Sequence, residues 1–177
     1  LAVVGGKGVI DRPLLTKALG HHDPADGFLN LSVDLGGDLP GAQATLVGSG
    51  TALAGIRHRV FVVSKIGHWG ERTGQGVPKT TVDMIRLCAH ASLHRLRTDW
   101  LDVELCHEAN IADPSVYLEA FEALKGEGRI RAYGISTDSL EVLKRFNGNG
   151  TCSVVQVNYS MLNRTPEPEF LPYCQAH

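Results

Sequence analysis

The sequence lacks a strong excess of charge of either sign, and it also lacks any long apolar segment. Its 17 Lys and Arg residues against 19 Asp and Glu residues leave a net charge of −2, so no electrostatic attraction to nucleic acid or to an anionic membrane is expected. No apolar run approaches the roughly 18 residues that a transmembrane helix needs. The first residues, LAVVGGKGVIDRPLL, do not have the pattern of a signal peptide. We therefore expect a single globular domain over residues 1–177.

A second absence is that of any paired cysteine motif. The four cysteines, Cys88, Cys106, Cys152 and Cys174, lie far apart and form no C-x-x-C pair. Three of them fall in segments with the pattern of a helix or a strand. This usage favours a reducing, cytoplasmic setting over a disulfide framework.

From residue 59 onward, short apolar strands alternate with amphipathic helices. The predicted strands are 60–64, 100–107, 130–136 and 153–160, with a further candidate at 27–35. The predicted helices are 80–97, capped by Thr80, 113–128, capped by Asp113, 138–146, and one that begins near Pro166. Such alternation predicts a parallel α/β sheet, either open and doubly wound or closed as a (β/α) barrel. The segment VVGGKG lacks the G-x-G-x-x-G spacing of a nucleotide-binding sheet.

Polar residues stand where each predicted strand ends. Lys65 and His107 follow two of the strands, Ser136 and Thr137 end a third, and Gln156 lies in the fourth. Taken singly, Lys65 could reach water and His107 could be a hydrogen-bonded structural residue. Because ligands in parallel α/β folds meet the carboxyl ends of the strands, the set together predicts a site for a polar small molecule.

Four segments carry a resemblance to a known family. RVFVVSKIG, SLHRLRTDWLDVELCHE, LKGEGRIRAYGIST and VVQVNYSMLNR resemble the aldo-keto reductase superfamily, over about residues 44–177. The resemblance implies a (β/α)8 barrel, a TIM barrel, of which about six of eight units are present. It implies NADPH as cofactor and a small carbonyl compound as substrate. Lys65 and His107 would be active-site residues, and Ser136, Thr137 and Gln156 would hold the nicotinamide carboxamide.

The chain departs from that family at two points. The family's aspartate and tyrosine fall on Leu31 and Gly36, or on Ser32 and Gly37 in the neighbouring register, so neither register restores the catalytic pair. Losing a general acid typically lowers a rate by about 10²–10⁴-fold. The chain is also shorter than the roughly 250 residues of a complete barrel. An unclosed sheet would expose strand edges, which favours association, so a homo-oligomer is one expectation.

Other functions stay open from the sequence alone. A relative without catalytic activity would bind a cofactor or a partner, and a lyase or isomerase would use Lys65 as a base or Schiff-base amine. His90 and His94, four residues apart in a predicted helix, have a spacing that can bind zinc, although the glutamate of the metalloprotease signature is absent. Glu108, next to His107, is expected to be an acid at the rim of the site, where it could tune the histidine.

Overall fold

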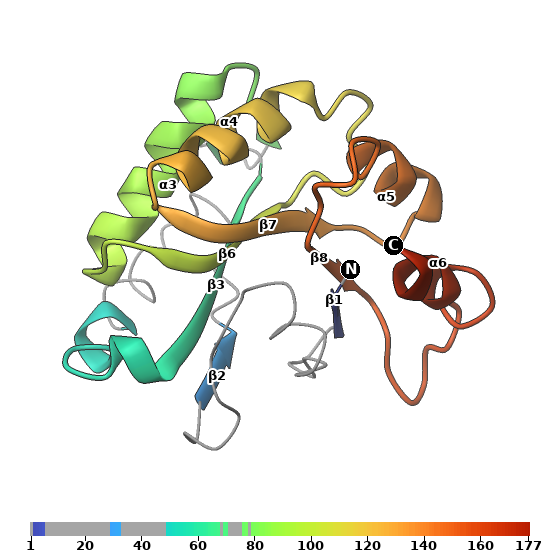
Figure 1. The fold of residues 1–177 in the computed structure, drawn as a ribbon, viewed down its shortest axis with the longest axis horizontal. Helices are drawn as coiled ribbons and strands as arrows, with labels where there is room; N and C mark the ends of the chain where they lie inside the picture. The colour runs from blue at the N-terminus through green and yellow to red at the C-terminus, as the bar shows by residue number, and fades with distance from the viewer. Residues whose placement is uncertain (1, 6–28, 33–48, 68, 71–75, 78) are drawn as a thin grey trace.

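The computed structural model describes residues 2–5, 29–32, 49–67, 69–70, 76–77 and 79–177, and these build a curved parallel sheet (Figure 1). The sheet has the strand order β1-β8-β7-β6-β3-β2, and each pairing is parallel. Its strands are β1 (Ala2–Gly5), β2 (Leu29–Ser32), β3 (Val60–Ile66), β6 (Leu101–Cys106), β7 (Ile130–Ser136) and β8 (Val154–Val157). The predicted parallel α/β sheet, curled as an incomplete (β/α) barrel, is confirmed.

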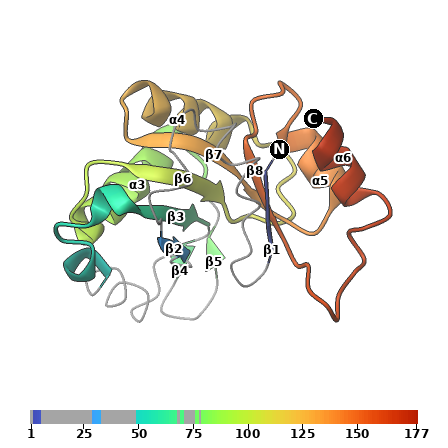
Figure 2. The same ribbon diagram turned by 60° about the horizontal axis from the view of Figure 1, so that its bottom comes forward.

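Three helices connect successive strands and a fourth follows β8, and all four lie on the outer side of the sheet (Figure 2). They are α3 (Val82–Leu96), α4 (Ser115–Gly126), α5 (Leu140–Phe146) and α6 (Phe170–Ala176), and a short 3-10 turn, η2 (Arg57–Arg59), precedes β3. The glycine-rich segment after β3 contains a small antiparallel pair, β4 (Trp69–Gly70) and β5 (Gly76–Val77). Among the residues that the structure describes, no helix combines the length and the apolar character that crossing a bilayer requires.

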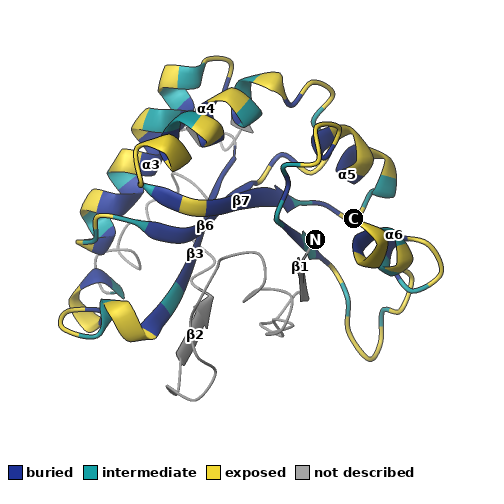
Figure 3. Cartoon of the chain, viewed as in Figure 1, coloured by how far each residue is buried: buried dark blue, intermediate teal, exposed yellow. Residues whose placement is uncertain are grey.

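Alternation along the strands separates two apolar clusters. Successive strand residues face opposite sides of a sheet. The inner cluster gathers Val63, Val103, Leu105, Ala132 and Val154, one or two residues from each central strand. The outer cluster is larger and packs the other face of the strands against the helices. Strand residues are therefore buried along almost their whole length, while each helix keeps one exposed face (Figure 3).

Two helices begin later than the sequence predicts. Thr81, not Thr80, caps α3, because its Oγ1 accepts the backbone N–H of Met84 at 3.2 Å. The α4 helix begins at Ser115, whose N–H donates to Asp113 Oδ1 at 2.9 Å, so Asp113 caps from just before the helix. In both cases the side chain that satisfies a free N–H at the helix start decides where the helix begins.

Strand β8 is shorter than the predicted strand over 153–160 and ends at Val157. The next backbone N–H, that of Asn158, donates to Asp138 Oδ1 at 2.6 Å. A side chain from the segment after β7 therefore takes the donor that a longer ladder would have used. This contact ends the strand directly after Gln156 and Val157.

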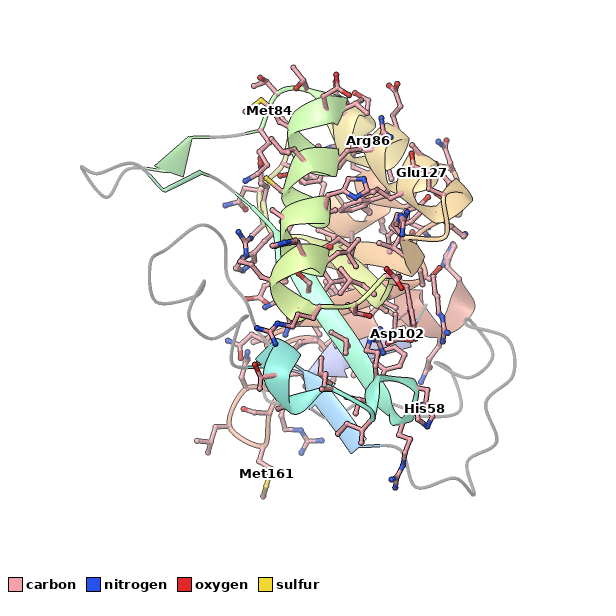
Figure 4. The ribbon with its side chains drawn as sticks, turned by 90° about the vertical axis from the view of Figure 1, so that its left-hand side faces the viewer. His58, Met84, Arg86, Asp102, Glu127 and Met161 are labelled. Carbon is pink, nitrogen blue, oxygen red and sulfur yellow. The ribbon has the colours of Figure 1, made fainter. Side chains whose placement is uncertain are left out.

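The amino-terminal ends of β3, β6 and β7 are joined by a buried carboxylate. Asp102 Oδ2 accepts from Arg57 Nη2 and from the backbone N–H of Val62, each at 2.9 Å. Asp102 Oδ1 accepts from Arg131 Nη1 at 3.1 Å. Both guanidinium groups also lie over the ring of Trp100, at 4.4 and 5.2 Å from its centroid. Met84 lies in the first turn of α3, near the carboxyl-terminal ends of the strands, and Asp102 lies at the opposite end of the sheet (Figure 4). The cluster around Asp102 therefore stabilises the fold far from the predicted site.

Candidate active site at the carboxyl ends of the strands

Lys65 lies inside strand β3, near its carboxyl end, and is only 6% exposed. The strand continues to Ile66, two residues further than the sequence predicts. Lys65 is in register with Leu105 of β6, and by strand alternation it shares the inner face with Val63. The alternative in which this lysine simply reaches water does not describe the structure, because the side chain is buried.

His107 follows β6 directly and is exposed. Its backbone N–H donates to the carbonyl of Ile66 at 2.8 Å, which extends the pairing of β3 and β6 by one residue. Gly67 lies close beside it: a Cβ at position 67 would be 3.1 Å from His107 Cβ. By the same alternation His107 belongs to the face that carries Leu105 and Lys65. The ammonium and the imidazole groups therefore lie on the same face, at the carboxyl-terminal end of the sheet.

Ser136 and Gln156 are paired in register across β7 and β8, and both are half-buried. Their closeness depends on Gly134, because a Cβ at that position would lie 1.6 Å from the Val154 carbonyl oxygen. In the part of the chain that the structure describes, the buried Oε1 atom of Gln156 has no hydrogen-bond partner. An unpaired buried acceptor is costly, so this edge offers a position for an external donor.

Thr137 differs from the other predicted site residues because its hydroxyl is already used. Its Oγ1 donates to the Ala109 carbonyl at 2.7 Å and accepts the Ser139 N–H at 3.1 Å. Its backbone N–H donates to the Gln156 carbonyl at 2.9 Å. Thr137 therefore joins the end of β7 to the segments after β6 and within β8, and it is almost fully buried.

Glu108, which the sequence predicts to be an acid at the rim of the site, is buried. Its Oε1 accepts the hydroxyl of Tyr117 at 2.6 Å and the backbone N–H of Lys79 at 3.5 Å. Lys79, itself 5% exposed, donates from Nζ to the Gly67 carbonyl. Sequence reasoning missed Lys79 and Tyr117, because both contacts join separate elements and neither follows from a local spacing.

None of the four tyrosines is set up to donate a proton at this edge. The hydroxyls of Tyr117, Tyr133 and Tyr159 each donate to a glutamate, and the Tyr173 hydroxyl accepts from Asn147 at 3.4 Å. Burial and the neighbouring Glu108 raise the pKa of Tyr117, which makes it a weaker acid. Leu31 lies in β2 opposite Val62, and Gly36 lies outside the described residues.

The histidine pair in α3 lies far from this edge, on the outside of the molecule. His90 Nε2 is 3.8 Å from Glu127 Oε2, next to the ion pair between Arg86 and Glu127 at 2.5 Å (Figure 4). Within the described ranges, no group of three or more His, Cys, Asp or Glu side chains is arranged to hold a metal ion.

Comparison with known proteins gives a consistent family. The family model described as "Aldo/keto reductase family" matches residues 42–177. Methylglyoxal reductase YeaE of Escherichia coli (strain K12) is 36% identical over 129 residues, which are 71% of this chain and 42% of the relative. The chain thus spans less than half the length of that curated relative.

Two solved structures share the fold. The holo form of aldo-keto reductase AKR11C1 from Bacillus halodurans aligns with a TM-score of 0.71 at 31% identity, covering 94% of this chain and 53% of that one. An aldo/keto reductase from Klebsiella pneumoniae in complex with NADP and acetate aligns with a TM-score of 0.68 at 29% identity, covering 86% and 50%. With a family match that covers most of its length, this chain belongs to the aldo/keto reductase family.

Proposed function

We propose that this chain forms part of the active site of an NADP(H)-dependent oxidoreductase that reduces an aldehyde or ketone to an alcohol. The observation that carries the proposal is that Lys65, His107, Ser136 and Gln156 all lie at the carboxyl-terminal end of the sheet, where the buried Gln156 Oε1 has no hydrogen-bond partner among the described residues. Family membership and the NADP-bound relative from Klebsiella pneumoniae support the choice of cofactor.

The residues at the end of β7 and β8 fit a nicotinamide carboxamide. The unpaired Gln156 Oε1 would accept the carboxamide N–H, and the Ser136 hydroxyl lies in the paired position on the next strand. Thr137 would take part through its backbone and not through its side chain, because its hydroxyl already donates to the Ala109 carbonyl. When bound, the reduced nicotinamide supplies a hydride to the carbonyl carbon.

The remaining groups would act on the carbonyl oxygen. The ammonium of Lys65, largely withdrawn from water, would stabilise the negative charge that develops there. The imidazole of His107 would hold the oxygen and donate the proton that completes the alcohol, directly or through a water molecule. The absence of the family's tyrosine at Gly36 makes His107 the group on which proton transfer depends.

A small aldehyde is the proposed substrate class. The relative with 36% identity is a methylglyoxal reductase, and a compact 2-oxoaldehyde suits a site formed by strand ends alone. A reducing, cytoplasmic setting is proposed with it, because all four cysteines are buried and free.

A cofactor-binding relative without turnover is the second candidate. It is favoured by one specific observation, the Leu31 and Gly36 residues at the positions of the catalytic pair. The first candidate predicts carbonyl-dependent NADPH oxidation, whereas the second predicts binding alone.

A titration of NADPH against the purified chain, followed by nicotinamide fluorescence, tests the proposal. We expect saturable binding that Gln156→Ala weakens by about tenfold, the usual effect of losing one buried hydrogen bond. Gln175→Ala, which changes an exposed glutamine of α6, is the matched control and should leave the affinity unchanged.

Turnover is then measured as methylglyoxal-dependent oxidation of NADPH. Turnover that His107→Ala abolishes supports the reductase. Binding without turnover supports the second candidate, and the absence of saturable binding would rule out both for this chain.

A further inference from the structure

A buried cluster of an ammonium, a carboxylate and a tyrosine hydroxyl begins at Glu108, the residue after His107. Lys79, Glu108 and Tyr117 are 5%, 8% and 1% exposed. The Glu108 carboxylate accepts from the Tyr117 hydroxyl at 2.6 Å and from the Lys79 backbone N–H at 3.5 Å, and the Lys79 ammonium donates to the Gly67 carbonyl. The mechanism proposed above uses none of these three side chains. Burying an ammonium and a carboxylate is costly unless both are well bonded.

These contacts close the base of the β4–β5 hairpin. The chain leaves strand β3 at Gly67, forms the two short antiparallel strands, and returns at Lys79. The ammonium therefore joins the first residue of the excursion to the last. Two residues later Thr81 caps α3, so the return point is fixed from both sides. A hairpin of two-residue strands has little stability of its own, and the bond at its base supplies a constraint that the strands lack.

The same contacts fix the backbone on both sides of His107. On one side, the His107 N–H donates to Ile66 at 2.8 Å, and Gly67 packs against His107 closely enough that a Cβ there would be 3.1 Å from His107 Cβ. On the other side, the next residue is Glu108, whose carboxylate is held by α4 through Tyr117 and by the hairpin through Lys79. The imidazole thus extends from a backbone segment that two elements hold in place.

We propose that Lys79 and Glu108 are positioning residues. They set the orientation of His107, and they hold the base of the hairpin beside the carboxyl-terminal ends of the strands. The role in catalysis rests on the proposed function, whereas the role in holding the backbone does not. Neither residue contacts the reacting atoms in this proposal. Lys79 acts through Gly67, and Glu108 acts through its own backbone.

Amide hydrogen exchange of the whole chain tests the proposal without any need for turnover. In Lys79→Met we expect exchange to become at least about tenfold faster in peptides that contain β4, β5 and His107, because a charge-assisted bond at the base is lost. Lys79→Arg, which keeps a donor, should restore slow exchange in part. Lys144→Met removes an exposed lysine of α5 and serves as the matched control. Exchange at wild-type rates in those peptides of Lys79→Met would overturn the proposal.

The orientation of His107 has its own measurement. The imidazole carbon resonance of His107, identified by its loss in His107→Ala, should shift or broaden in Lys79→Met and in Glu108→Ala, and stay unchanged in Lys144→Met. Glu108→Ala also covers the case in which Lys79→Met fails to fold, because it removes the acceptor of the Tyr117 hydroxyl and of the Lys79 N–H and leaves the bond from Lys79 to Gly67 in place. An unchanged His107 resonance in a folded Glu108→Ala protein would overturn the proposal.

If the wild-type chain oxidises NADPH, kcat should fall in Lys79→Met and Glu108→Ala while the affinity for NADPH stays constant, since neither residue lies at β7 or β8. A wild-type chain that does not turn over contradicts the proposed function and leaves the exchange and resonance results to decide the positioning role. A folded Lys79→Met protein with wild-type kcat would contradict the catalytic part of the inference.

Discussion

Replacing Glu104 with glutamine should make the fold markedly more stable at alkaline pH. Glu104 lies in β6, opposite Ser64 of β3, and it is fully buried. Within the described chain, neither of its carboxylate oxygens nor the Ser64 hydroxyl has a hydrogen-bond partner. Burial raises the pKa of Glu104 from 4.5 to about 8.

The sign of the pH effect on the free energy of unfolding depends on whether the folded or the unfolded chain binds the Glu104 proton more tightly. The folded protein keeps Glu104 protonated up to about pH 8, whereas the unfolded chain releases that proton near its ordinary pKa. Below pH 4.5 the residue therefore causes no loss of stability. As the pH rises from 4.5 to 8, unfolding becomes easier by about 1.4 kcal/mol per pH unit. The total loss is about 5 kcal/mol at pH 8 and is constant above it.

Glu104→Gln removes the ionisation and keeps the shape of the side chain. The free energy of unfolding of the variant should match that of the wild type near pH 4.5, within about 1 kcal/mol, and exceed it by roughly 3 kcal/mol at pH 7 and 5 kcal/mol at pH 8. Urea denaturation followed by circular dichroism at these three pH values measures the difference. Glu119→Gln, at an exposed position of α4, is the control. A difference between variant and wild type that is the same at pH 4.5 and pH 8 would refute the reasoning.

Three further changes have outcomes that the packing determines. Asp102→Ala should lower the free energy of unfolding by about 3–5 kcal/mol in urea denaturation, because two arginines and a backbone N–H lose a buried carboxylate; an effect below 1 kcal/mol would contradict this. Gly134→Ala should abolish NADPH binding or unfold the chain, because its Cβ would collide with the Val154 carbonyl; unchanged fluorescence titration would contradict it. Thr81→Ala should lower the free energy of unfolding by about 1 kcal/mol, measured by thermal unfolding, and Thr80→Ala should lower it clearly less. A larger effect of Thr80→Ala would mean that Thr80 is the helix cap, as the sequence predicts.

From residue 59 onward the sequence was sufficient for the order of the longer strands and helices and for the end of the sheet at which polar groups gather, whereas the short strands β1, β4 and β5 were not predicted. Both depend on local patterns: the alternation of apolar residues in the strands, and the position of Lys65 and His107 directly after apolar runs. The assignment of catalytic and cofactor roles to those residues stays a prediction. Two adjacent threonines, Thr80 and Thr81, are equivalent as caps in sequence, and only the backbone decides between them.

The contacts that sequence reasoning could not supply are those between distant segments. Lys79 stands after a glycine-rich stretch and has the pattern of a solvated loop lysine, yet its ammonium is buried against Gly67. Glu108 likewise has the pattern of an acid at the rim of the site, and its burial depends on Tyr117, nine positions later. The strands of the β4–β5 hairpin have two residues each, too few for any periodicity to be visible.

The pairing of β1 with β8 has a consequence for folding in the cell. Ala2 is in register with Val154, so the ribosome adds its partner about 150 residues later, a delay of roughly 8 to 30 seconds at typical rates of synthesis. Neighbouring strands such as β6 and β7 are only about 30 residues apart and can pair almost at once. The amino-terminal strand must therefore stay unpaired in a nascent chain whose sheet is already growing, and its length of only four residues limits the risk that it pairs with another molecule in that interval.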